Sequence, residues 1–261
     1  MEDFRSDGFG VPDSASLAWP EDDRFPGKAG VVGDSTSAYQ HLKHLLLTGF
    51  FRAGERIDVN WAASAIGVSA TPVREALIRL SSERLVIAHA NRGFFYPVPR
   101  AETLADELKF RFSLSSLCWN SLGELAIADL NRLTHDSMRL RASKVNDEAE
   151  PRTVVDTLDH CYLMLSKCIL SACAYREMLG CTERTLVVRR CFIEKEQYRI
   201  QATANAIDLV KAIMIRDKGQ VERAISNQLG FDLEAIPFAV ERLRSRSFDL
   251  RGTRPSGADR A

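Results

Sequence analysis

Apolar side chains recur at helical spacing in three short runs near the start of the chain. The first run begins at Ser35 and predicts a helix that ends near Gly49. Its apolar positions are Tyr39, Leu42, Leu45, Leu46 and Phe50. Asp58 and Gly67 bracket a second, shorter helix, because Asp58 can accept a backbone N–H of the first turn and Gly67 can end the helix in a left-handed conformation.

The third run, residues 68–80, opens with residues suited to a helix start. Ser69 or Thr71 can cap this helix, and Pro72 is tolerated in the first turn, where its missing N–H is no loss. The buried stripe consists of Val73, Leu77 and Leu80. Two short helices that meet at a tight turn predict a helix-turn-helix.

Residues 85–89 and 94–98 have the pattern of two strands. The four residues between them, Ala90 to Gly93, form a hairpin turn in which Gly93 supplies a positive φ angle. Three helices followed by a hairpin predict a winged helix-turn-helix.

From residue 101 to about residue 243 every clear segment is helical, with breaks near 144–151, 173–176 and 216–219. No strand pattern intervenes, so six or seven helices should pack as an antiparallel bundle. The predicted fold class is mostly α: an N-terminal winged helix-turn-helix of three helices and a β-hairpin wing, followed by an all-α antiparallel helical bundle.

Both ends of the chain lack an apolar stripe. Residues 1–33 are rich in glycine, proline and aspartate, which predicts a disordered N-terminal tail. Order should fade after about residue 243, with a flexible C-terminal tail at 246–261. Between the tails we expect a winged helix-turn-helix domain at 34–99 and a helical domain at 100–245.

Composition and motifs argue against a membrane protein, a secreted protein and an enzyme. The chain has 35 basic and 35 acidic residues, is 45% hydrophobic, and has no basic N-terminal region followed by an apolar run, so we expect a cytoplasmic protein with no membrane partner. Its six cysteines form no C-x-x-C pair and should be thiols, mostly in the core, with redox sensing as the alternative. No G-x-S-x-G, H-E-x-x-H or Gly-rich phosphate loop occurs, so we expect no enzyme.

Four motifs follow one another at fixed distances between residues 53 and 94. They are Ala53-Gly54-Glu55-Arg56-Ile57, Gly67-Val68-Ser69, the helix start Ser69 to Leu77, and Asn91 to Phe94. With this set the segment 35–98 resembles the DNA-binding domain of the GntR family, in particular its FadR-like branch. The resemblance implies a sequence-specific transcriptional regulator, acting as a repressor, whose homodimer binds a palindromic operator of double-stranded DNA.

A recognition helix turns its N-terminal residues toward the bases of the major groove, which makes Ser69, Thr71 and Arg74 the candidates for DNA contact. The resemblance implies that Arg92 and Gly93, at the tip of the wing, reach the neighbouring minor groove. Arg79 is a further candidate, although it could equally belong to an ordinary solvated helix face. Residues 35–100 hold eight basic and four acidic residues, a positive excess that suits phosphate binding.

Two residues depart from the family pattern. Ala70 stands where an arginine is usual, so one charged contact with DNA is missing. Arg84 stands where the third helix usually ends in glycine, and a left-handed non-glycine residue costs roughly 1 kcal/mol.

The C-terminal helices resemble the effector-binding domain of the same branch, the FCD type. In that domain a divalent metal commonly binds a carboxylate ligand. The metal is held by an Asp and a His one helical turn apart and by two later histidines. Asp156 and His160 match the first pair, but Ala206 and Gln228 stand where the later histidines are expected. We therefore expect no cofactor; the alternative is a divalent metal such as zinc on Asp156 and His160, completed by other donors.

Arg111 matches an arginine that faces the cavity in the family. The resemblance thus implies a small anionic metabolite as effector, bound by Arg111, Asp156, His160 and Gln228. The alternative is a degenerate, effector-independent helical domain, in a regulator that acts by DNA occupancy or protein contact.

Overall fold

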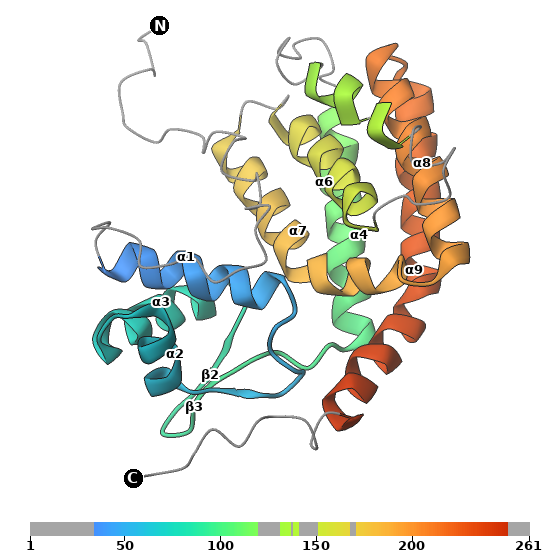
Figure 1. The fold of residues 1–261 in the computed structure, drawn as a ribbon. Helices are drawn as coiled ribbons and strands as arrows, with labels where there is room; N and C mark the ends of the chain where they lie inside the picture. Colours follow the sequence, from blue (N-terminus) through green and yellow to red (C-terminus); the bar gives the residue numbers. More distant parts are fainter. Residues whose placement is uncertain (1–33, 120–130, 137, 141–150, 168–170, 250–261) are drawn as a thin grey trace, which may run out of the picture. The chain divides into compact units, whose positions relative to one another are not determined.

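The computed structural model describes residues 34–119, 131–136, 138–140, 151–167 and 171–249 (Figure 1). Three helices and a small sheet come first, and a series of longer helices follows. The predicted fold class is confirmed: a winged helix-turn-helix precedes an all-helical region.

The first three helices pack around one apolar core. They are α1 (Asp34–Leu47), α2 (Val59–Ile66) and α3 (Ala70–Ser82). The side chains that fill this core are Leu42, Leu46, Val73, Leu77 and Leu80, all almost fully buried. Because one face of α3 is buried against α1 and α2, its opposite face is left exposed.

Helix ends follow the predicted caps, with one exception. Asp58 accepts the N–H groups of Asn60 and Trp61, and Gly67 ends α2 at a φ of 81°. Ser69 occupies the N-cap position of α3, but its side chain makes no capping hydrogen bond, and Thr71 lies inside the helix, so the predicted side-chain cap is wrong. The third helical residue is Pro72, which has no N–H to donate to such a cap.

Arg84 adopts the predicted left-handed conformation, at a φ of 63°. It follows the C-cap residue Glu83, and the next N–H, of Leu85, donates to the carbonyl of Leu80 at 3.0 Å. This pattern closes a helix and usually uses glycine.

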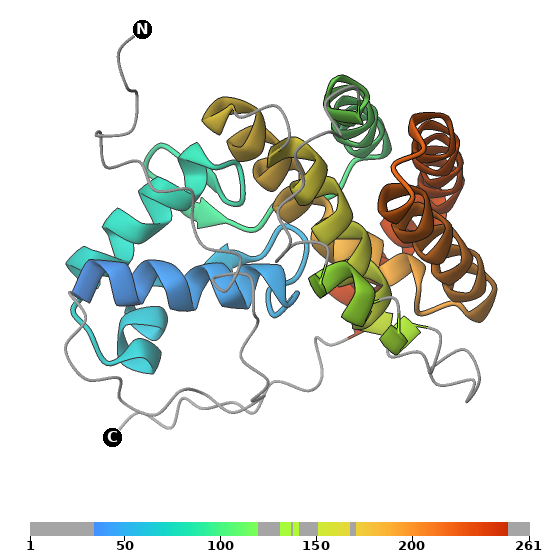
Figure 2. The same cartoon turned by 90° about the horizontal axis from the view of Figure 1, so that it is seen from above.

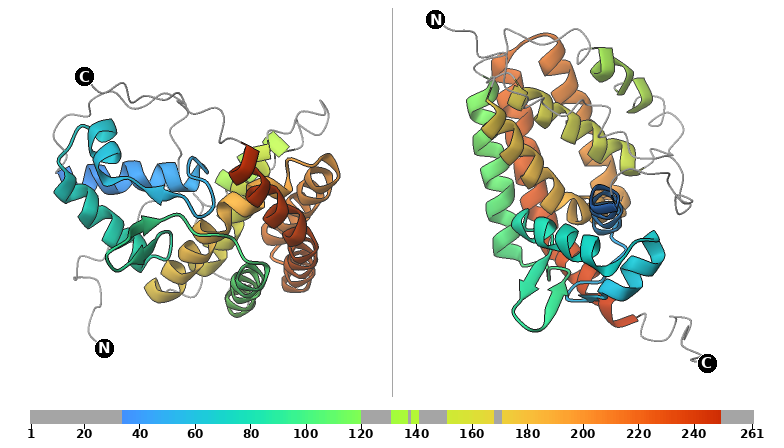
Figure 3. Two further views of the ribbon diagram at one scale, coloured as in Figure 1. Left: turned by 90° about the horizontal axis from the view of Figure 1, so that it is seen from below. Right: turned by 90° about the vertical axis from the view of Figure 1, so that its left-hand side faces the viewer.

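A three-stranded antiparallel sheet completes the winged helix-turn-helix (Figure 3). Its strands are β1 (Arg56–Ile57), β2 (Ile87–His89) and β3 (Gly93–Phe95), in the order β1-β3-β2. The hairpin strands are shorter than the predicted 85–89 and 94–98, because Leu85 and Val86 are buried in the core before the pairing starts. The sequence did not predict β1, because a strand of two residues is too short to show an alternation of apolar and polar side chains.

Five longer helices form the helical region (Figure 2). They are α4 (Ala101–Cys118), α6 (Pro151–Lys167), α7 (Ala172–Phe192), α8 (Glu196–Met214) and α9 (Lys218–Asp249). Residues 131–136 and 138–140 are also helical. Helices α4, α7 and α8 pack against α9, and α6 packs against α7 and α8. The core of this region includes Leu108, Phe192 and Ile236.

Of the predicted helix breaks, the one at 216–219 is confirmed, because α8 ends at Met214 and Arg216 is left-handed at a φ of 56°. The break at 173–176 is wrong. The Ser171 hydroxyl accepts the N–H of Ala174, so residues 173–176 form the first turns of α7. The break at 144–151 falls outside the described residues, apart from Pro151.

The predicted C-terminal tail begins too early, because α9 continues through residues 246–249. Extending an existing helix costs little per residue even without an apolar stripe. The remaining tail segments, 1–33 and 250–261, lie outside the described residues.

The cysteines of the described segments agree with a structural role for most of them. Cys118, Cys161, Cys181 and Cys191 are buried thiols, and Cys173 is exposed. In the described part of the chain, no helix is both long and apolar enough to cross a membrane.

Candidate nucleic-acid interface and buried cavity

The outer face of α3 carries the side chains predicted to contact DNA. Ser69, Thr71 and Arg74 are all exposed at its N-terminal end. Among the described residues, Arg74 has no ion-pair or hydrogen-bond partner. Its guanidinium is therefore available for a phosphate or a base edge.

Arg79 lies five residues beyond Arg74 on α3, and its side chain already has two partners. Its guanidinium carbon lies 3.8 Å from the ring centre of Tyr39, and its Nε lies 3.5 Å from Oε1 of Glu83. The side chain is still 62% exposed, so it can reach solvent, but binding DNA would compete with two existing contacts.

The tip of the wing presents the other predicted pair. Arg92 is exposed, and Gly93 has a φ of 94° that disfavours any residue with a Cβ. A Cβ at Gly93 would lie 3.4 Å from Nε of Arg56 in β1. Arg56, which is also exposed, is thus brought beside the wing by the β1–β3 pairing that the sequence did not reveal.

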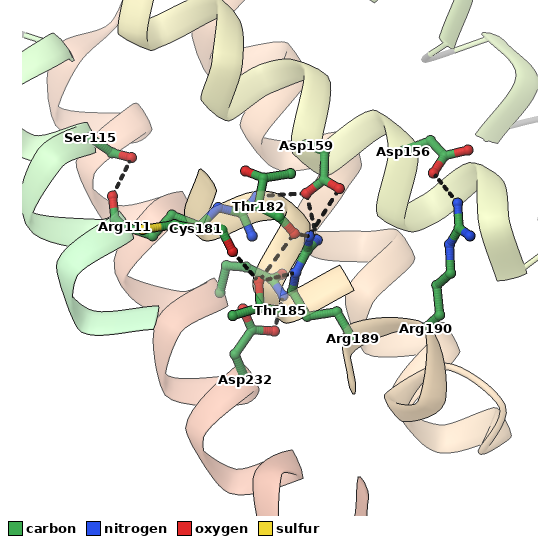
Figure 4. Close-up of polar contacts among 11 residues, drawn as sticks. Arg111, Ser115, Asp156, Asp159, Cys181, Thr182, Thr185, Arg189, Arg190 and Asp232 are labelled. Atoms are coloured by element: carbon green, nitrogen blue, oxygen red, sulfur yellow. Dashed lines mark hydrogen bonds and ion pairs between the residues drawn. The ribbon is translucent and has the colours of Figure 1, made fainter. Parts of the chain in front are cut away.

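Inside the helical region, two arginines converge on one carboxylate (Figure 4). Nη2 of Arg111, from α4, donates to Oδ1 of Asp159, from α6, at 2.8 Å. Arg189, from α7, donates through Nη1 to Oδ1 of Asp159 and through Nη2 to Oδ2 at 3.0 Å. Both arginines are at most 4% exposed, so this is a buried ion cluster whose members depend on one another for their counter-charge.

A second carboxyl group, Asp232 of α9, faces the same arginines. Burial raises its pKa to about 6, although the positive charges of Arg111 and Arg189 oppose the rise. Nε2 of Gln228 donates to Oδ1 of Asp232 at 2.7 Å, and Asn205 donates to Gln228 at 3.0 Å. The predicted residue Gln228 is thus held in a chain of polar side chains.

These groups border a small cavity. Its polar lining comprises Arg111, Arg189, Gln228, Asp232 and the hydroxyl-bearing Tyr162, and the rest of the wall is apolar. The volume is about 10 Å³, close to the space that one water molecule needs. Nε of Arg111 is buried and has no hydrogen-bond partner among the described residues, so one donor at the cavity remains unsatisfied.

Asp156 and His160 do not share a partner. Asp156 accepts from Arg190 at 3.2 Å, and Nδ1 of His160 lies 3.2 Å from Oδ2 of Asp136. Burial raises the pKa of Asp156. Burial also acts to raise the pKa of Asp136, but the hydrogen bond and charge of His160, together with Arg132 and His135, lower it overall. Figure 4 shows Asp156 turned toward Arg190, apart from Asp159.

The donors do not fit the metal centre that the family resemblance implies. Ala206 is fully buried, and Gln228 is bonded to Asn205 and Asp232. The described segments contain no group of three His, Cys, Asp or Glu side chains placed to hold an ion. Metal binding by Asp156 and His160 stays an untested alternative.

Sequence reasoning missed Asp159, Arg189 and Asp232. A signal existed: each is a charged residue within a helical run whose neighbours are largely apolar, and Asp232 follows Gln228 by one helical turn. Arg111 was predicted to face the cavity, and the structure places it there.

Comparison with known proteins finds similarity mainly in the N-terminal segment. Residues 34–95 match the model of bacterial regulatory proteins of the gntR family. An HTH-type transcriptional regulator of Mycobacterium tuberculosis is 40% identical over 70 residues, which are 27% of this chain and 28% of that protein. The Nta operon transcriptional regulator of Aminobacter aminovorans is 48% identical over 61 residues, 23% of this chain and 29% of that protein. The matches thus span less than a third of these relatives.

Two solved structures share the fold over most of the chain. The E. coli protein McbR/YncC superposes with a TM-score of 0.60 at 20% identity, covering 83% of this chain and all of that one. A GntR transcriptional regulator of Rhodococcus sp. RHA1 gives 0.63 at 20% identity, covering 80% and 99%. At this identity the similarity concerns the fold.

Proposed function

We propose that this protein is a DNA-binding transcriptional regulator, because residues 34–95 match the model of bacterial regulatory proteins of the gntR family. The observation that carries the proposal is the exposed face of α3, where Arg74 stands without a partner among the described residues beside Ser69 and Thr71. Arg92 and Gly93 of the wing extend this surface, with Arg56 beside them. These groups suit phosphate and base contacts in adjacent grooves.

The regulator acts as a homodimer on a palindromic operator, in the cytoplasm, and represses by occupying that operator. Two copies related by a two-fold axis would place two recognition helices on half-sites about one helical turn of DNA apart. The helical region would form the dimer interface, because the winged helix-turn-helix binds DNA in this proposal.

The helical region binds a small anionic metabolite at the cavity lined by Arg111 and Gln228. Arg111 supports this role, because it is buried, charged and has an unsatisfied Nε at the cavity. A carboxylate ligand would compete with Asp159 for the guanidinium groups. The present cavity is too small for a metabolite, so binding requires the surrounding helices to move apart.

A second candidate function also has a specific observation in its favour. Asp159 already neutralises Arg111 and Arg189, and the cavity holds little more than one water molecule. If the charges of the helical region are already paired with one another, no ligand is needed to neutralise them. The protein would then be a regulator without an effector, acting by DNA occupancy or protein contact.

The test of DNA binding is selection from a pool of random duplexes with the purified full-length chain, followed by a salt titration on the enriched sequence. We expect a palindrome bound with an affinity that falls steeply with salt. A pool that stays unenriched would contradict sequence-specific binding. Sedimentation of the complex should give two protein chains per palindrome.

The test of the effector is thermal unfolding in a panel of small mono- and dicarboxylates, with wild type and Arg111→Gln compared. A carboxylate that raises Tm in wild type but not in the variant, and that changes operator affinity, would support the anionic effector. Identical Tm values across the panel, with unchanged operator affinity, would favour the effector-independent regulator.

A further inference from the structure

One turn of α7, Thr182 to Thr185, has polar contacts on two sides, and on the inner side they run through Arg189 of the same helix to Asp159 of α6. On the inner side Arg189 holds it: Nε donates to the Thr185 hydroxyl at 3.1 Å, and Nη2 donates to the Thr182 carbonyl at 2.9 Å. The same guanidinium binds both oxygens of Asp159. The position of this turn therefore depends on the buried ion cluster (Figure 4).

On the outer side Glu183 contacts the winged helix-turn-helix. Glu183 binds Nζ of Lys43, from α1, at 2.8 Å. The same ammonium donates to Tyr39 at 3.0 Å and to Glu83 at 3.1 Å. Three acceptors thus match the three N–H bonds of Lys43. The side chains of Lys43 and Glu183 are 19% and 12% exposed, so this pair is screened less than a surface ion pair.

Glu83 connects this contact to the recognition helix. It is the C-cap residue of α3, it accepts the Tyr39 hydroxyl at 2.8 Å, and it lies 3.5 Å from Nε of Arg79. A displacement of Lys43 would therefore act on the end of α3 and on the arginine stacked over Tyr39.

The neighbouring residue of the turn makes a second outward contact. Arg184 donates to both oxygens of Glu107, from α4, at 2.8 and 2.7 Å. Arg84, directly after α3, approaches Glu107 at 3.4 Å. Glu107 stands one helical turn before Arg111, which binds Asp159, so α4 joins the ion cluster to the winged helix-turn-helix as α7 does.

We propose that the turn Thr182–Thr185 transmits the state of the Arg111–Asp159–Arg189 cluster to the recognition helix through Glu183–Lys43 and Arg184–Glu107–Arg84. Breaking the pairing of Asp159 with Arg189 frees this part of α7 from α6, and the outer contacts then reposition α3. The inference rests on the proposed DNA binding, and it names how the helical region would regulate that binding. It requires no particular effector, because any event that separates Asp159 from Arg189 has the same consequence.

A double-mutant cycle on the full-length protein tests this link. Asp159→Asn perturbs the inner side, and the pair Glu183→Ala with Arg84→Ala cuts both outer contacts. Binding to the duplex enriched from the random pool is measured by fluorescence anisotropy at fixed salt. Asp208→Asn and Glu222→Ala, at exposed positions on α8 and α9, are the matched controls.

Asp159→Asn should change operator affinity about fivefold or more in the wild-type background and less than about twofold when the outer contacts are cut. Equal changes in both backgrounds, or no change in either, would overturn the link. If Asp159→Asn fails to fold, Thr185→Val replaces it, because this variant removes only the hydroxyl bonded to Arg189.

Hydrogen exchange of the α3 backbone amides, measured without DNA, tests the link to α3 independently of the proposed DNA binding. Asp159→Asn should alter exchange in α3 only when the outer contacts are intact, and this holds whether or not DNA binds. Unaltered exchange in α3 would overturn the link while leaving DNA binding untouched, and absence of DNA binding with altered exchange would overturn the proposed function alone.

Discussion

Arg111 and Asp159 form an ion pair across the interior of the helical region, with Nη2 and Oδ1 2.8 Å apart. A buried pair of this kind stabilises a fold less than its Coulomb energy suggests, because both groups lose their hydration. Removing one partner is a different matter, since the other charge then stays buried without compensation. Asp159 serves two arginines, so its loss leaves Arg111 and Arg189 both without this counter-charge.

Asp159→Ala should therefore lower the free energy of unfolding by about 3–5 kcal/mol. Chemical denaturation of wild type and variant measures the change, with the exposed Asp208→Ala as a control that should stay within about 0.5 kcal/mol. A loss of less than about 1 kcal/mol for Asp159→Ala would show that the cluster is not the buried network described above.

Asp232 should make stability depend on pH in the opposite sense to a carboxylate whose pKa is lowered by folding. Burial raises its pKa to about 6, so the folded protein keeps a proton that the unfolded chain loses near pH 4. The contribution of Asp232 to stability is therefore greatest below pH 4 and is lost as pH rises to about 6. Asp232→Asn imitates the protonated group and should stabilise the protein at pH 7.5 by up to about 3 kcal/mol.

Thermal unfolding of this pair of proteins from pH 4.5 to pH 8 measures the effect. The Tm advantage of Asp232→Asn should shrink toward the acid end of the range. An Asn variant less stable than wild type at pH 7.5 would mean that Arg111 and Arg189 depend on an ionised Asp232.

Glycine should be preferred at the two left-handed positions that close helices, Arg84 and Arg216. Arg84→Gly and Arg216→Gly should each raise the free energy of unfolding by up to about 1 kcal/mol, because the conformational strain of a Cβ disappears. Lys211→Gly, at an exposed site within α8, should instead cost about 1 kcal/mol. Equal losses at all three sites would argue against left-handed backbone at 84 and 216.

Operator binding should not depend on a metal ion. Asp156 and His160 are bonded to Arg190 and Asp136, and they lie far along the chain from α3. Dialysis against a chelator should leave operator affinity and Tm unchanged, and Asp156→Ala and His160→Ala should leave operator affinity within about twofold in the absence of effector. A loss of operator affinity or Tm after chelation, with a stoichiometric metal found by elemental analysis before it, would contradict this expectation.

The sequence predicts the winged helix-turn-helix well because its determinants are local. Asp58, Gly67 and Gly93 each act on neighbouring residues. The left-handed conformation of Arg84 was expected from the family resemblance, in which glycine usually ends this helix. The missing cap at Ser69 is also local, and Pro72 at the third helical position would have revealed it. Strand β1 is different, because two residues acquire their structure only from pairing with β3.

The buried cluster could not be predicted in the same way. Helical spacing placed Asp156 and His160 on one face, but it does not say which face meets a neighbouring helix. Asp159 turns toward Arg111 and Arg189, residues that are 48 and 30 positions away in sequence. Such contacts depend on how α4, α6 and α7 pack, which a periodic pattern does not determine.

If α3 is the recognition helix, replacing Arg74 with alanine must weaken operator binding. Fluorescence anisotropy on the enriched duplex should show a loss of about tenfold or more for Arg74→Ala, corresponding to about 1–3 kcal/mol. Arg79→Ala should lose less, because its guanidinium is already bound to Tyr39 and Glu83, and the exposed Arg176→Ala on α7 should lose nothing. Unchanged operator affinity for Arg74→Ala would contradict the assignment of α3 as the recognition helix.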